Sequence, residues 1–316
     1  MRRYGPAGGF MADVLNNFLL SVFPVALMFF LGFALGRRGT FASGDAATIF
    51  KFIAQIAAPA IIFNIMFTSD FGGADLKLVG LYLLAEAVIY VGTMVLVTLL
   101  FRVDLKNAVL AGMAASFSNH VLFAYPVTKL AFAPEHVLPV EGIIAFDMVI
   151  FTLSVVALDM IAGPRDGVFA ALRRQAWNPL LVALFAGLCL RMIPAEPHPT
   201  LVRSAEFIAA TAAPCGLFAT GVVLSAPIVA VNMRLAVLIS TMKMVMHPLI
   251  GAGFVLVLGG YAFDPARTTM LVTVAPVGVM ALTFASRYDG ERGAVAMSIL
   301  WSMVISVLII PVLIAL

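Results

Sequence analysis

The chain has 316 residues, of which 63% are hydrophobic and only 11% are charged, and its mean hydropathy is +1.09. Soluble domains are about half apolar and about a quarter charged, so this composition excludes a soluble protein and predicts an integral membrane protein. The formal net charge of +3 is small and falls in short connections, which argues against a nucleic-acid-binding surface.

Long apolar segments follow one another along the chain. A helix needs about 20 apolar residues to cross a bilayer core of about 30 Å. Segments of this kind, separated by charged or Gly/Pro/Asp-rich stretches, predict about ten transmembrane helices. They are expected near residues 16–36, 46–67, 78–101, 107–131, 140–162, 177–193, 205–226, 234–258, 266–286 and 293–316. Whether translation starts at Met1 or at Met11 stays open.

Two octapeptides indicate an internal repeat. Residues 56–63 read IAAPAIIF and residues 211–218 read TAAPCGLF, so Pro59 and Pro214 fall at matching positions and are expected to kink their helices. The polar stretch 163–176 divides the ten segments into five and five. Because five is odd, the second copy must enter the membrane from the opposite side, which makes the repeat an inverted one. A chance alignment of apolar sequence is the alternative.

The predicted fold is therefore an all-α integral membrane protein of about ten transmembrane helices in two inverted five-helix repeats. The repeats are expected at residues 1–162 and 177–316, joined by a cytoplasmic connection at 163–176. Of the Lys and Arg residues other than Lys243, eleven are assigned to the side of this connection and seven to the other. This bias predicts that both termini are non-cytoplasmic, in a cell membrane such as the bacterial inner membrane.

Helix breakers and small polar residues occur at mid-membrane depth in the fourth and ninth segments. A break there frees backbone N–H groups, which is tolerated only inside protein or against a water-filled cavity. Such N–H groups at a half-helix N-terminus suit an anion, and an Asn side chain adds an amide donor. The alternative is simple kinks and interhelical hydrogen bonds. The predicted substrate-binding residues are Ser118, Asn119, His120, Pro126, Pro276, Val277 and Gly278.

Ionisable residues inside the apolar segments are the candidates for ion coupling. Glu86 and Lys243 occupy matching positions of the two halves, and Asp147 lies in the fifth segment. A charge at the bilayer centre costs about 3 kcal/mol or more, so each such group is expected to be paired or functional. A structural ion pair of Glu86 with Lys243 is the alternative reading. For His247, one turn after Lys243, a hydrogen bond to a carbonyl is the favoured role.

Signatures of enzymes are absent from the sequence. It contains neither a phosphate-binding GxxxxGK[ST] loop nor a GxSxG nucleophile elbow. Its four scattered histidines and two cysteines show no metal-ligand spacing. We therefore expect no enzyme activity, no cofactor and no metal.

Several motifs, in order along the whole chain, resemble the auxin efflux carrier family, whose bacterial members include proteins regarded as malonate transporters. They are GFALGRRG (32–39), AAPAIIF (57–63), SNHVLFAYP (118–126), NP (178–179), APCGLFATG (213–221), Lys243 with Pro248, and APVGVMALTFASRY (275–288). The resemblance implies ten helices in two inverted repeats, with helices four and nine broken where they cross. It also implies transport of small organic anions by an elevator-like motion.

Carried over to this chain, the resemblance places the crossover prolines at Pro126 and Pro276 and the anion site at Asn119. His120 and Ala124 depart from the usual small residue and glycine of the family, which leaves the substrate open. The long cytoplasmic loop of the plant hormone exporters is replaced by the short stretch 163–176, so auxin is not the expected substrate.

The function predicted from the sequence is secondary active transport of small mono- or dicarboxylates such as malonate. The expected partners are the carboxylate, a coupling proton or sodium ion and the lipid bilayer, and a homodimer is left open. Two alternatives stand. One is a sodium-coupled symporter of the bile-acid type, which is disfavoured because residues 270–286 hold no Asn, Gln, Asp or Glu. The other is a membrane sensor that binds its ligand without moving it.

Overall fold

A computed structural model describes residues 7–164, 167–193, 198–228 and 231–316. In the first half the helical elements are α1 (Ala7–Asn17), η1 (Phe18–Val22), α2 (Phe23–Arg37), α3 (Ser43–Phe52), η2 (Ile53–Ala57), α4 (Ala58–Thr68), η3 (Phe71–Gly73), α5 (Leu76–Phe101), α6 (Leu105–Ser116), η4 (His120–Ala124), α7 (Tyr125–Ala131), η5 (Pro134–His136) and α8 (Leu138–Ala162). In the second half they are α9 (Val168–Ala176), α10 (Pro179–Arg191), α11 (Pro199–Ala209), α12 (Ala212–Ser225), α13 (Met233–Thr241), η6 (Met242–Met246), α14 (His247–Ala252), η7 (Gly253–Leu258), α15 (Phe263–Thr273), α16 (Val279–Arg287) and α17 (Arg292–Ala315).

The predicted all-helical membrane architecture is confirmed at this coarse level. Among the described residues, seven helical stretches are long and apolar enough to cross a membrane, and α10 is a shorter apolar helix. The predicted segments 107–131 and 266–286 each form two helical pieces separated by a few extended residues. The predicted connection 163–176 contains the short helix α9.

Prolines explain most of the local irregularity of the long helices. The π-helical turns η1, η2, η4 and η6 each end two residues before a proline, namely Pro24, Pro59, Pro126 and Pro248. A proline ring clashes with the carbonyl four residues earlier and donates no hydrogen bond, so the turn before it widens into a π bulge. The expected kink at Pro59 therefore takes the form of the bulge η2. Pro214 lies in the first turn of α12, just after α11 ends.

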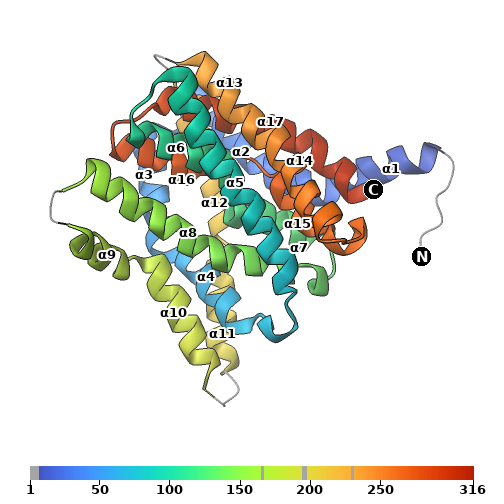
Figure 1. The fold of residues 1–316 in the computed structure, drawn as a ribbon. Coiled ribbons are helices and arrows are strands. Elements are labelled where there is room, and N and C mark those ends of the chain that lie inside the picture. The colour runs from blue at the N-terminus through green and yellow to red at the C-terminus, as the bar shows by residue number, and fades with distance from the viewer. Residues whose placement is uncertain (1–6, 165–166, 194–197, 229–230) are drawn as a thin grey trace.

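The helices pack into two groups (Figure 1). In one group, α2 packs along α12 and α4 packs along α10. In the other, α5 contacts α6, α8 and α14, while α17 contacts α13 and α16. The broken pieces α6 and α16 lie against each other within this second group. Candidate cavities therefore arise where the two groups face each other.

Glycines allow α2 and α12 to approach closely. A Cβ atom at Gly221 would overlap the Phe29 carbonyl and lie 2.6 Å from Phe33 N, and one at Gly32 would lie 2.8 Å from the carbonyl carbon of Phe218. Helices in membranes lack a hydrophobic driving force for association, so close backbone packing at small residues holds them together. The α2–α12 pair thus depends on side chains of minimal size.

We expect Gly221→Ala to destabilise the protein by about 1–3 kcal/mol, because the added methyl group forces the two backbones apart. Thermal unfolding of the detergent-purified protein measures this loss as a lower Tm. Gly92→Ala is the matched control, since a Cβ at Gly92 meets no atom within 4 Å. Equal Tm values for the two variants would contradict the close-packing account.

Candidate functional site

The two broken segments meet at the centre of the second helix group. Ser118 and Val277 form an antiparallel β-bridge. Asn119 N donates to Pro276 O at 2.8 Å, and Gly278 N donates to Phe117 O at 2.9 Å. Each break thus supplies hydrogen-bond partners for the backbone groups that the other break leaves unpaired. Buried backbone groups need such partners because no water reaches them.

Neighbouring helices fix the position of these loops. Ser302 of α17 accepts a hydrogen bond from Val277 N at 3.0 Å, and Ser306 donates to Val274 O at 2.7 Å. Ser118 donates through its hydroxyl to Val272 O at 2.7 Å. A Cβ at Gly278 would lie 3.2 Å from Phe117 O, so glycine suits the crossing of the two chains. The breaks are therefore rigidly held.

A cavity of about 400 Å³ opens beside the crossing, between the two helix groups. Five of the predicted site residues line it, namely Ser118, Asn119, His120, Asp147 and Gly278. The first residues of the helical pieces that follow each break, Val121–Leu122 and Val279–Ala281, also line it. The first four N–H groups of a helix lack intrahelical partners and carry partial positive charge. The cavity wall therefore favours an anion.

The side chains of Asn119 and Lys51 add donors to this wall. Asn119 is 5% exposed, and among the described residues its amide Nδ2 has no hydrogen-bond partner. Lys51 of α3 lines the same cavity. In the sequence, Lys51 counts only among the charges that set the topology, although a lysine inside the predicted segment 46–67 is a usable signal of a site.

A second cavity of about 660 Å³ lies between α2, α4, α7 and α12. The predicted binding residue Pro126 lines this second cavity together with Lys129 and Glu206. The turn η4 lies between Pro126 and the crossing of the breaks. Val121 lines both cavities. Val121 was not singled out from the sequence, where it is one of many apolar residues.

Two of the predicted binding residues support the site without lining it. Pro276 and Val277 are buried, and their backbone groups bond to Asn119 and Ser302. Ser118 lines the cavity, but its hydroxyl already donates to Val272 and accepts from Lys243. Pro276, Val277 and Ser118 therefore hold the two loops in position through these hydrogen bonds.

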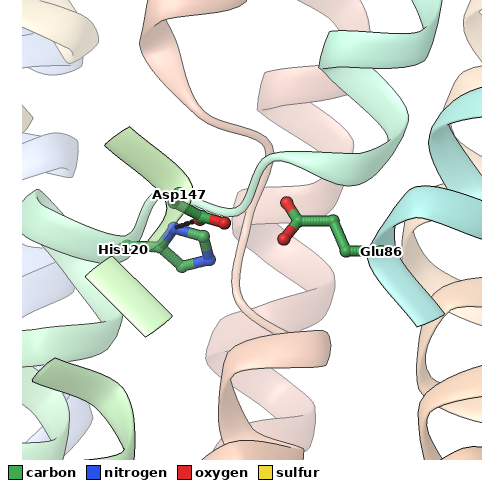
Figure 2. A group of neighbouring side chains, drawn as sticks. All are labelled: Glu86, His120 and Asp147. Carbon is green, nitrogen blue, oxygen red and sulfur yellow. Dashed lines mark ion pairs between the residues drawn. The ribbon is translucent and has the colours of Figure 1, made fainter. Parts of the chain in front are cut away.

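A cluster of ionisable side chains lies against the crossing (Figure 2). Asp147 in the middle of α8 is 2% exposed, and its Oδ2 lies 2.5 Å from His120 Nδ1. His120 Nε2 lies 3.1 Å from the hydroxyl of Tyr82. Glu86 on α5 is fully buried and points toward Asp147. Tyr82 precedes Glu86 by one helical turn, so their shared face could have been read from the sequence.

Lys243 is engaged elsewhere than at Glu86. Its Nζ donates to the Ser118 hydroxyl and to Thr273 O at 3.3 Å, and it lies 3.0 Å from His247 Nδ1. The alternative reading, a structural ion pair of Glu86 with Lys243, has no support among the ion pairs of the described residues. The expected bond from His247 to a carbonyl is replaced by its contact with Lys243. Lys243 thus ties α13–α14 to both breaks.

We expect Ser118→Ala to lower stability by about 1–3 kcal/mol, because it removes a hydrogen-bond partner of the buried Lys243. Ser116→Ala is the matched control, since in the described part of the chain the buried Ser116 hydroxyl has no hydrogen-bond partner. Thermal unfolding in detergent compares the two variants. A drop in Tm of the same size in both would show that the Ser118 hydroxyl contributes nothing specific.

Comparison with known proteins gives consistent matches over nearly the whole chain. The model of the family described as "Membrane transport protein" matches at residues 17–165 and 164–314, which together cover almost the whole chain. A protein of Rhizobium meliloti (strain 1021) named "Putative malonate transporter" is 25% identical over 300 residues, which cover 90% of this chain and 91% of that protein. An "Uncharacterized transporter" of Methanothermobacter thermautotrophicus is 23% identical over 297 residues, 92% of this chain and 95% of that protein.

Proposed function

The chain belongs to the membrane transport protein family, the family of the auxin efflux carriers, and from this premise we propose that it is a secondary active transporter of small carboxylates. Membership confirms the resemblance found in the sequence and makes the chain a multi-span membrane protein of a transporter family. The name of the Rhizobium relative supports malonate as the first substrate to try.

One observation carries the proposal: two helical pieces begin at one cavity, beside an amide donor. The stretches His120–Ala131 and Val279–Arg287 both start at the 400 Å³ cavity, and Asn119 lies between them. Helix N-termini aimed at a midplane site are the usual means by which transporters hold an anionic substrate group. Lys51 on the opposite helix group would face the second carboxylate of a dicarboxylate.

The proposed architecture has ten crossings in two inverted repeats. In it, α6 with α7 and α15 with α16 supply the fourth and ninth crossings, and α10 supplies the sixth. The odd number of crossings per repeat supports the inversion, and the distribution of Lys and Arg supports termini outside the cytoplasm. The residues of the 163–176 connection would then be cytoplasmic.

Alternating access would occur between the two helix groups. The two cavities lie between these groups, and Val121 borders both. Movement of the group that carries the breaks, relative to the α2–α4–α10–α12 group, would expose the anion site to one cavity and then to the other. Asp147 in the cavity wall would repel a carboxylate unless a cation neutralises it, which supports coupling through Asp147 and Glu86.

Uptake into proteoliposomes tests this function. Purified protein is reconstituted, and labelled malonate, acetate, succinate and a neutral sugar are supplied with a pH gradient, a sodium gradient or none. We expect saturable uptake of malonate that a cation gradient increases, and no uptake of the sugar or by protein-free vesicles. Malonate that binds but is never taken up would favour the sensor alternative and contradict transport.

A further inference from the structure

We infer that Glu86, His120 and Asp147 form a binding site for a divalent transition-metal ion at the edge of the carboxylate cavity. These residues come from α5, η4 and α8, and one potential ligand atom of each lies within 4.8 Å of the others. Figure 2 shows the three side chains converging beside the crossing of the two breaks. Because each ligand comes from a different element, no motif with metal-ligand spacing is present in the sequence.

The carboxylates of this cluster have few of the partners that burial normally requires: Asp147 contacts His120, and Glu86 forms no ion pair among the described residues. In the described part of the chain, the two carboxylate oxygens of the fully buried Glu86 have no hydrogen-bond partner. The two carboxylate oxygens of Asp147 have none either. A buried carboxylate without partners is strongly destabilising, because its lost hydration is not replaced. A bound cation would satisfy both groups at once.

His120 and Asp147 lie in direct contact, as an ion pair when the imidazole is protonated. Asp147 Oδ2 lies 2.5 Å from His120 Nδ1, yet this oxygen receives no properly directed hydrogen bond. A metal ion bound by both atoms, at about 2.0–2.2 Å from each, would replace this contact and hold the two atoms about 3 Å apart. On the other edge of the ring, Nε2 lies 3.1 Å from the Tyr82 hydroxyl. Metal-ligating imidazoles commonly have such an outer partner, which fixes the ring.

The charge balance around the cluster also favours a dication. The titratable groups that face it are Tyr82, Lys243 and His247, and of these only Lys243 is ordinarily cationic. With both carboxylates ionised and His120 neutral, the cluster and Lys243 together carry one net negative charge next to a cavity proposed to hold an anion. A bound dication would reverse that sign. Metal and carboxylate would then increase each other's affinity, since such coupling is reciprocal.

The ligand set selects the kind of cation. Magnesium and calcium prefer sites made of oxygen atoms, whereas imidazole suits zinc, copper, iron and nickel. Three protein ligands leave at least one coordination position open. His120 and Asp147 line the cavity, so the open position would face the substrate. This last step rests on the proposed function, whereas the metal site itself does not.

Metal binding to the purified protein tests the inference without any transport measurement. Protein in detergent is stripped with a chelator and titrated with Co²⁺ alone, followed by its visible absorption, and with Mn²⁺ for electron spin-echo detection of a coordinated nitrogen. We expect one ion per chain and a histidine nitrogen signal. Glu86→Gln, Asp147→Asn and His120→Ala should each weaken binding by about tenfold or more, because each removes a direct ligand.

His136→Ala and Glu135→Gln are the matched controls, since both residues are exposed and lie outside the cluster. Absence of saturable binding by the wild type, or equal binding by the ligand variants and the controls, would overturn the inference. So would displacement of Co²⁺ by Na⁺ at comparable concentrations. The nitrogen signal of the wild type keeps the test valid even if a ligand variant fails to fold.

A malonate arm separates this inference from the proposed function. Addition of malonate should tighten Co²⁺ binding and change the Co²⁺ spectrum of the wild type. Bound metal that malonate leaves unaffected supports the metal site and contradicts the carboxylate site beside it. Malonate uptake by a protein that binds no metal supports the transporter and overturns the metal site.

Discussion

Asn119→Ala is expected to weaken malonate binding by about tenfold to a hundredfold and to lower uptake at subsaturating malonate to the same extent. The amide Nδ2 lies at the cavity without a partner among the described residues, so it is free to donate to a carboxylate. A hydrogen bond to a charged group contributes about 1.5–3 kcal/mol, which corresponds to this range of affinity. Isothermal titration in detergent measures the binding, and proteoliposome uptake measures the transport.

Asn16→Ala serves as the matched control, because Asn16 is exposed on α1 and does not line the cavity. Asn119→Asp adds a stricter comparison, since it keeps the size of the side chain but replaces the donor with a charge that repels the substrate. Unchanged malonate affinity in both Asn119 variants would remove Asn119 from the anion site.

Val121→Trp is expected to abolish uptake while malonate binding in detergent stays within a few-fold of the wild type. Val121 borders both cavities, so a large ring there blocks the movement of substrate from one cavity to the other. Because the donors at Asn119 and at the start of α16 are unchanged, the substrate can still bind from one side. The pair of measurements thus separates binding from translocation.

Val95→Trp is the control, because Val95 is 50% exposed on the outer face of α5. A Val121→Trp variant that transports at the wild-type rate would show that the two cavities are not the two ends of one pathway. Loss of both binding and uptake in this variant would instead place Val121 in the substrate site itself.

Sequence reasoning located the two breaks because their signals are local. Asn119, Pro276 and Gly278 interrupt apolar segments where a helix former is expected, and the structure brings all three together. The predicted repeat rests on signals of the same local kind, the matching Pro59 and Pro214. Helix-breaking residues within one segment can be read directly from the sequence, because proline and glycine are among the clearest local signals.

The contacts between segments could not be predicted in the same way. Repeat alignment placed Glu86 and Lys243 at matching positions, but the structure directs Lys243 toward Ser118 and Glu86 toward Asp147. The groups that meet at Asp147 come from three helices whose rotations are set by packing. Pro126 follows the break in sequence, yet the turn η4 carries it to the second cavity. These outcomes depend on tertiary geometry that no single segment specifies.

A structure of the protein determined in the presence of saturating malonate tests the central claim most directly. We expect density for the anion in the 400 Å³ cavity, with one carboxylate within hydrogen-bonding distance of Asn119 Nδ2 and of the first N–H groups of α16. Malonate bound instead in the 660 Å³ cavity beside Lys129, away from both breaks, would contradict the account.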